Sequence, residues 1–102
     1  MTFGFPSRTG LSALEYELVA EQANALGYTG RAAESALAAL AAREGQGDKA
    51  EIEHLIDLAA QAVWALFVQR EICGMTNGQD VIDRYAIPSK VLARLGAAPR
   101  HL

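Results

Sequence analysis

Few residues of this 102-residue chain have types and spacings that could support chemistry. Glu51 and His54 stand three positions apart. On a helix this Glu-x-x-His spacing puts a carboxylate and an imidazole on one face, as in the di-iron sites of four-helix bundles. Such a site needs a second motif and further carboxylates, and the only other histidine is His101. Acidic residues in a helix's first turn are also explained by the helix dipole. The sequence therefore predicts no metal site and no cofactor.

The common catalytic motifs are absent from the sequence. It contains no Gly-x-Ser-x-Gly nucleophile motif and no glycine-rich phosphate loop. Its single cysteine, Cys73, excludes a disulfide framework within the chain and a multi-cysteine metal site. We therefore predict no catalytic residue and expect that the chain is not an enzyme.

The segment 79–96 has the pattern of a DNA-binding helix-turn-helix, with two short helices around a small and an apolar residue. Ser89, Lys90 and Arg94 could then face a groove of the duplex. Two aspartates oppose the few cations nearby, and the chain carries a net charge of −3. Nucleic-acid binding needs clustered cations and is disfavoured. A small DNA-binding regulator that uses this segment is the alternative function.

Arg70 and Glu71 follow an apolar stretch and could be buried charges. If this part of the helix is enclosed, the guanidinium of Arg70 needs a carboxylate partner. The candidates are Glu71 of a second chain, or Asp80 or Asp83. An anion or ligand site at Arg70 is the sharper alternative.

Helices are the elements expected to position these residues. The chain has 20 alanines and 12 leucines, which favour helix. Ser12 and Glu15 form a capping box that predicts a helix start. Before it, glycines and a proline predict an irregular arm over residues 1–10. The rings of Phe3 and Phe5 on this arm would pack on their own chain or on a partner.

Gly27 and Gly30 leave two interpretations of residues 12–44. The glycines could end one helix and start another. However, Leu26 and Leu37 are eleven residues apart, which is about three turns at 3.6 residues per turn. Because the hydrophobic phase survives the glycines, one continuous helix is favoured, bent near them.

A second long helix is predicted over residues 49–73. Asp48 can cap its start, while Gly45 and Gly74 suit the left-handed positions at helix ends. From Ala59 to Val68 this helix is apolar nearly all round, so it must be covered on every side.

These elements predict a single all-α domain over residues 1–102, a long antiparallel helical hairpin with two short C-terminal helices at 79–86 and 90–95. One antiparallel partner cannot cover the apolar half of the second helix. We therefore predict a homodimer whose core is a four-helix bundle. The predicted interface residues are Trp64, Phe67, Val68, Val63 and Ala60.

Three stretches resemble a small uncharacterised bacterial family of all-helical proteins: Leu14-Glu15-Tyr16-Glu17, Val63-Trp64-Ala65-Leu66-Phe67-Val68-Gln69-Arg70-Glu71-Ile72-Cys73-Gly74 and Val91-Leu92-Ala93-Arg94-Leu95-Gly96. The similarity covers most of the chain. It implies a helical fold and no activity.

The expected function is that of a non-enzymatic oligomeric protein acting through protein–protein interaction, its protein partner unidentified. No apolar run approaches the ~18–20 residues of a transmembrane helix, so no membrane association is expected. The N-terminus lacks the features of a secretory signal. With one cysteine, a reducing cytoplasmic location is the expectation.

Overall fold

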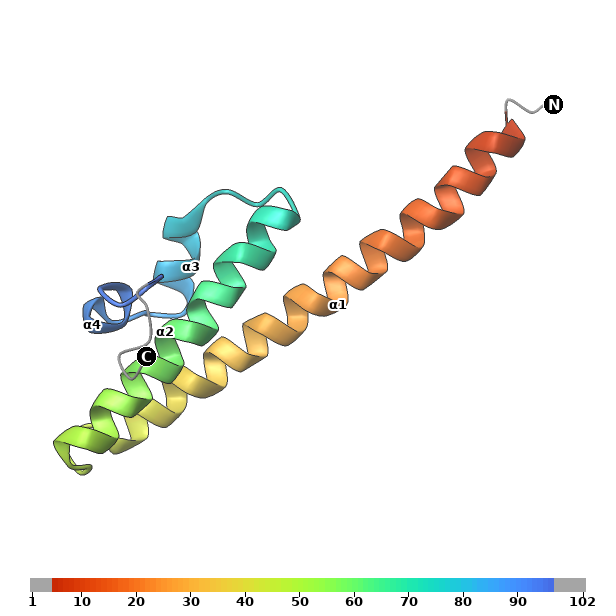
Figure 1. The fold of residues 1–102 in the computed structure, drawn as a ribbon. Helices are drawn as coiled ribbons and strands as arrows, with labels where there is room; N and C mark the ends of the chain where they lie inside the picture. The colour runs from red at the N-terminus through yellow and green to blue at the C-terminus, as the bar shows by residue number, and fades with distance from the viewer. Residues whose placement is uncertain (1–4, 97–102) are drawn as a thin grey trace.

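The computed structural model describes the backbone of residues 5–96 and the side chains of residues 12–96. Within these ranges it contains helices and no strand, which confirms the all-α class. None of the described helices is long and apolar enough to cross a membrane. The elements, in chain order, are α1 (Phe5–Arg43), α2 (Lys49–Ile72), α3 (Gly78–Arg84) and α4 (Ser89–Leu92) (Figure 1).

The first helix, α1, runs unbroken through Gly27 and Gly30, which confirms the continuous interpretation. It begins at Phe5, so the predicted start at Ser12 and the irregular arm before it are wrong for the described residues. A proline is tolerated in a first turn, where its missing N–H would have no partner. Extending a helix also costs less than starting one. Phe3 and the side chain of Phe5 lie outside the described residues.

The second helix, α2, begins and ends close to the predicted positions. Asp48 caps its start, and its carboxylate accepts a hydrogen bond of 2.8 Å from the backbone N–H of Glu51. Gly45 and Gly74 have φ angles of +84° and +79°, which glycine adopts without the steric cost that a Cβ brings. The turn at Gly45 therefore reverses the chain and makes α1 and α2 an antiparallel hairpin (Figure 1).

The core forms where α3, α4 and the turn between them close over the hairpin. α2 supplies half of the buried residues. Much of the surface from Ala59 to Val68 is thus covered within one chain, by α1 on one side and the C-terminal helices on another. The buried residues are Ala33, Leu40, Ile56, Ala59, Ala60, Val63, Leu66, Val81, Ile87 and Val91.

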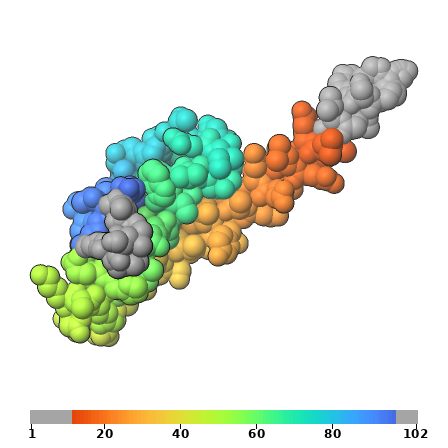
Figure 2. Space-filling view, in the orientation of Figure 1, coloured from red at the N-terminus to blue at the C-terminus, as the bar shows by residue number. Residues whose placement is uncertain are grey.

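The longer helix, α1, extends past the end of α2 as a free arm (Figures 1 and 2). The thiol of Cys73 contacts the carbonyl oxygen of Gln22 at 3.9 Å, so α2 ends alongside this residue. Residues 5–21 of α1 have no other described helix beside them, over about 25 Å at 1.5 Å per residue. The radius of gyration is 18.5 Å, against about 13 Å for a compact domain of this size.

Candidate functional site

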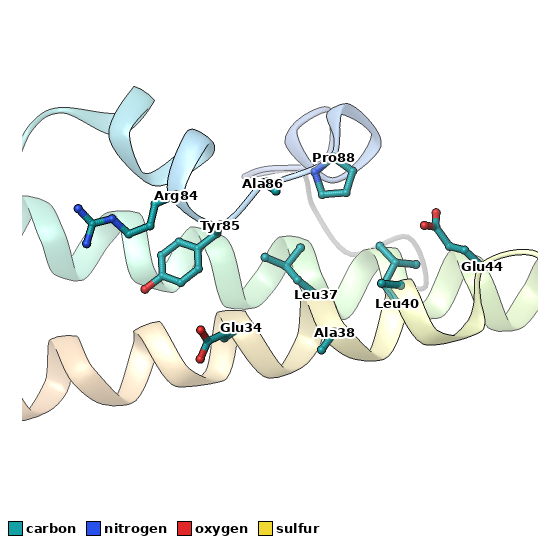
Figure 3. A pocket seen from close by; sticks show the side chains of 10 residues that line it. Glu34, Leu37, Ala38, Leu40, Glu44, Arg84, Tyr85, Ala86 and Pro88 are labelled. Carbon is teal, nitrogen blue, oxygen red and sulfur yellow. The ribbon is translucent and has the colours of Figure 1, made fainter.

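A groove separates α1 from α3 and α4, and Tyr85 divides it into two cavities. Tyr85 follows the last residue of α3, and its ring points towards α1 (Figure 3). The cavity nearer the hairpin turn has a volume of about 350 Å³ and reaches Glu44 and Pro88. The cavity nearer the free arm, which we call the arm cavity, has a volume of about 380 Å³ and reaches Ala23 and Met75. Tyr85 lines both cavities.

Two glycines of α1 make room for side chains in this groove. A Cβ atom on Gly30 would lie 3.1 Å from the hydroxyl oxygen of Tyr85. A Cβ atom on Gly27 would lie 3.2 Å from Nη1 of Arg31. A glycine inside a helix costs roughly 0.5–1 kcal/mol relative to alanine. Tyr85 and Arg31 therefore both approach the backbone of α1 closely at these glycines.

The arm cavity carries an excess of positive charge. Its lining includes the guanidinium groups of Arg31, Arg70 and Arg84, and one carboxylate, that of Glu34. Arg84 pairs with Asp80 at 3.3 Å on the exposed surface. Within the part of the chain whose side chains are described, no carboxylate lies within 4.0 Å of Arg31 or Arg70.

Arg70 does not make the ion pairs predicted within its own chain. Its Nη2 donates a hydrogen bond of 3.2 Å to the backbone carbonyl of Asn77, and its Nε is buried without a partner. The predicted pairing with Asp80 or Asp83 is therefore wrong, because a backbone carbonyl takes their place. Glu71 is exposed in the single chain and is not a buried charge. A pairing of Arg70 with Glu71 of a second chain stays a prediction.

The residues predicted at a dimer interface divide between surface and core. Trp64 and Val68 are 50% and 38% exposed. Phe67 is half-buried, and its ring contacts the first residue of α3. Ala60 and Val63 lie in the core of the single chain, because the C-terminal helices cover this side of α2. A second copy could therefore contact Trp64 and Val68 but not Ala60 or Val63 in this arrangement.

Both cations of the DNA-binding alternative form ion pairs within the chain. Lys90 forms an ion pair with Glu44 at the end of α1. Arg94 forms ion pairs with two carboxylates of α2. Ser89 is exposed at the start of α4, which has only four residues and cannot present the face of a recognition helix. Nothing in the structure or the comparisons supports this alternative.

Arg94 fastens the C-terminal segment to the first half of α2. Its Nη1 donates to Oδ1 of Asp57 at 2.9 Å and to the backbone carbonyl of Glu53 at 3.3 Å. Its Nη2 donates to the carboxylate of Glu53. The hydrogen bond to the Glu53 carboxylate is the main cause that raises the pKa of Arg94, although desolvation acts in the opposite direction. These contacts assign Arg94 a structural role.

Glu51 and His54, the residues of the Glu-x-x-His motif, lie in the first turns of α2. Glu51 forms an ion pair of 3.1 Å with Arg43 across the hairpin turn, and His54 is exposed. No three His, Cys, Asp or Glu side chains of the described residues are grouped closely enough to hold a metal ion. The motif thus helps to close the hairpin.

Comparison of the sequence with models of known protein families gives a match. A family model matches residues 5–101, which is almost the whole chain. The chain belongs to DUF6665, a family of unknown function. The resemblance to an uncharacterised family is therefore confirmed. No curated protein and no solved structure matches the chain.

For this member of DUF6665, the sequence pattern did not indicate the groove or the residues that shape it. Arg31 and Tyr85 were not candidates, although an anion site at Arg70 was considered. The available signal was the pair Gly27 and Gly30, because glycines inside a helix of unbroken phase often mark a close approach by another group. The sequence could not name that group, since Tyr85 is 55 residues away from Gly30.

Replacing Gly27 with alanine is expected to raise the free energy of unfolding by about 0.5–1 kcal/mol. The added Cβ atom would approach only the flexible end of Arg31, which can move, whereas the unfolded chain loses backbone freedom. Urea unfolding followed by circular dichroism measures the change. Gly30→Ala should raise the free energy of unfolding by less, because its Cβ atom would meet the hydroxyl of Tyr85. A net loss of stability in Gly27→Ala would contradict this explanation.

Proposed function

We propose that this protein is a non-enzymatic homodimer that acts through protein–protein interaction. The two copies would join through one side of the α1–α2 hairpin, which we call the bare side because no described helix covers it. The observation that carries the proposal is a stripe of apolar side chains along this side. Its members are exposed on α2 and on the free arm of α1, and half-buried at Ala25 and Ala32 of α1. The absence of catalytic motifs from the sequence supports a role without chemistry.

On α2, the bare side presents large apolar side chains at helical spacing. Leu58, Val68 and Ile72 are exposed by 41%, 38% and 57%. With Ala65 they repeat at intervals of three, four and seven residues, so they form one stripe. The α2 residues that contact α3 lie on another face of the helix. Trp64 lies at the edge of the stripe, next to Gly96.

On α1, small and apolar residues continue the bare side. Leu14, Leu18, Ala25 and Ala32 repeat at intervals of four and seven residues, which puts them on one face. The α1 residues that line the groove are roughly half a turn away from this stripe at 100° per residue. The stripe therefore lies on the flank of the hairpin opposite α3 and α4.

A second copy is the partner that best fits this surface. Two hairpins packed through their bare sides would make a symmetric four-helix bundle. The alanines of α1 would let helix axes approach closely, while the larger residues of α2 would fill the centre. Removing apolar surface from water favours such an association. The proposal places the protein in the cytoplasm, where Cys73 would stay reduced.

The experiment is a measurement of mass in solution by light scattering at micromolar concentration. The wild-type protein should have twice the chain mass of 10.9 kDa. Leu18→Glu, on the bare side of the arm, should weaken the dimer at least about tenfold, because a carboxylate would be buried without a partner. Its fold should persist, since Leu18 has little packing within its own chain.

Ala13→Glu is the matched control, because this exposed residue of the same arm lies off the stripe. It adds the same charge and should leave the dimer intact. A monomeric wild-type protein would refute the proposal. Equal dissociation of both variants would attribute the effect to charge rather than to this surface.

A further inference from the structure

We infer that the arm cavity binds a small organic anion, with a carboxylate or phosphate head and an apolar body. The inference is independent of the proposed dimer, because this cavity lies on the flank of the hairpin that α3 covers. It rests on four features of the cavity: its charge, the fixed position of Arg70, the room that Gly27 leaves for Arg31, and its apolar walls.

The charge of the arm cavity is opposite in sign to that of the whole chain. The lining includes three arginines, Arg31, Arg70 and Arg84, and one acidic residue, Glu34, whereas the net charge of the chain is −3. Arg84 already pairs with Asp80, so Arg31 and Arg70 carry the charge argument. A recess lined by one sign of charge concentrates field lines and attracts the opposite charge. Guanidinium groups form paired hydrogen bonds with carboxylate or phosphate oxygens. The head of the ligand is therefore an oxyanion.

Arg70 is held in place before any ligand arrives. The backbone carbonyl of Asn77 accepts a hydrogen bond from Nη2, and Nε is buried among neighbouring atoms without a partner. A partly desolvated guanidinium without a carboxylate is unfavourable unless another negative group offsets its charge. Because the side chain is already ordered, an anion that binds here loses less conformational entropy.

Arg31 reaches the arm cavity because Gly27 has no side chain. The guanidinium of Arg31 folds back one helical turn, and its Nη1 lies 3.2 Å from the position that a Cβ atom on Gly27 would occupy. This direction agrees with the general tilt of helix side chains towards the N-terminus. The arrangement places a second guanidinium along the wall opposite α3, and no carboxylate among the described side chains pairs with it.

The remaining wall of the arm cavity is apolar. Its volume of about 380 Å³ is in the range of pockets that hold small organic molecules. The ring of Tyr85 closes one end. An apolar body on the ligand would displace water from these walls, which a bare inorganic ion could not do. The apolar residues that line it are Leu26, Leu66, Met75 and Val81.

The test is a titration followed by ¹H–¹⁵N NMR, with phenyl phosphate and benzoate as probes. We expect saturable shifts of the amide signals of Gly27, Gly30 and Met75 with at least one of them, and the tighter probe identifies the head group. Inorganic phosphate and phenol, each half of a probe, should bind at least about tenfold more weakly. No saturable shift with either probe would overturn the inference. Equal binding of inorganic phosphate would overturn the requirement for an apolar body.

Two arginine variants locate the site. Arg31→Gln and Arg70→Gln should each weaken binding about tenfold or more, since a hydrogen bond to a charged group contributes that much. Arg31 is exposed and its variant should fold, so the test holds even if Arg70→Gln is destabilised. Arg43→Gln is the charge-matched control, because Arg43 pairs with Glu51 at the hairpin turn. Equal weakening in the control would show general charge attraction and overturn the site.

Discussion

Replacing Leu40 with alanine is expected to lower the free energy of unfolding by about 2–5 kcal/mol. Leu40 is 1% exposed and belongs to the same buried cluster as Ile56 and Val91. It lies near the end of α1, where the hairpin closes, and it lines the cavity nearer the hairpin turn (Figure 3). Truncation would remove favourable burial and leave a cavity that helices fixed by the hairpin turn can only partly fill.

Urea unfolding at a fixed protein concentration measures this effect, because the stability of the proposed dimer would depend on concentration. Tyr16→Ala is the comparison, since Tyr16 is 76% exposed on the free arm. It removes a larger side chain and should change stability by no more than about 0.5 kcal/mol. A loss below about 1 kcal/mol in Leu40→Ala would mean that the core is not closed at this end.

Replacing Arg94 with methionine is expected to lower the free energy of unfolding by about 1–3 kcal/mol. The side chain is 23% exposed and contacts Glu53 and Asp57. Methionine keeps much of the apolar stem but removes every hydrogen bond. Without these hydrogen bonds, the segment that follows α4 would be held less firmly against α2.

Arg84→Met separates this effect from the loss of any arginine. Arg84 makes one exposed ion pair with Asp80, and such pairs contribute about 0–1 kcal/mol. The pKa of Arg94 is raised in the folded protein. Its contribution is therefore complete at neutral pH and is lost only when the pH rises through this raised pKa. Equal losses in the two arginine variants would contradict the structural role of Arg94.

The two proposed surfaces divide the hairpin into flanks with different roles. The bare side carries apolar stripes on α1 and α2 and suits a second copy of the chain. The groove side carries cations and cavities and suits a small anion. Because the flanks are opposite, a ligand in the arm cavity could bind while the dimer is intact. Titration of the dimer and of Leu18→Glu with the same probes would compare these states.

Much of the fold could be predicted because it depends on neighbours along the chain. Asp48 caps α2 through a hydrogen bond to a residue three positions away. Gly45 and Gly74 adopt the left-handed conformation at helix ends. The hydrophobic phase, which continues unbroken across Gly27, indicated a continuous α1, and the structure confirms it. Helix hydrogen bonds and side-chain periodicity span four residues or fewer, so the sequence pattern is enough to reveal them.

The start of α1 differs from the prediction, and the reason again concerns residues that are close together along the chain. Ser12 and Glu15 have the residue types of a capping box, but a cap is needed only where a helix begins. Once the helix is nucleated upstream, near Phe5, the same residues simply continue it. A local motif therefore cannot show whether the turn before it is already helical.

Which partner each side chain meets depended instead on contacts between distant segments. Ala60 and Val63 are buried because α3 and α4 fold back over α2. Of the predicted interface residues, Trp64 and Val68 are the ones that stay exposed. Arg94 meets Glu53, 41 residues away, and Tyr85 meets Gly30. Helix periodicity predicts which face of a helix a residue occupies. It does not predict which distant segment covers that face, because the covering segment depends on how all the apolar surfaces of the chain are buried together.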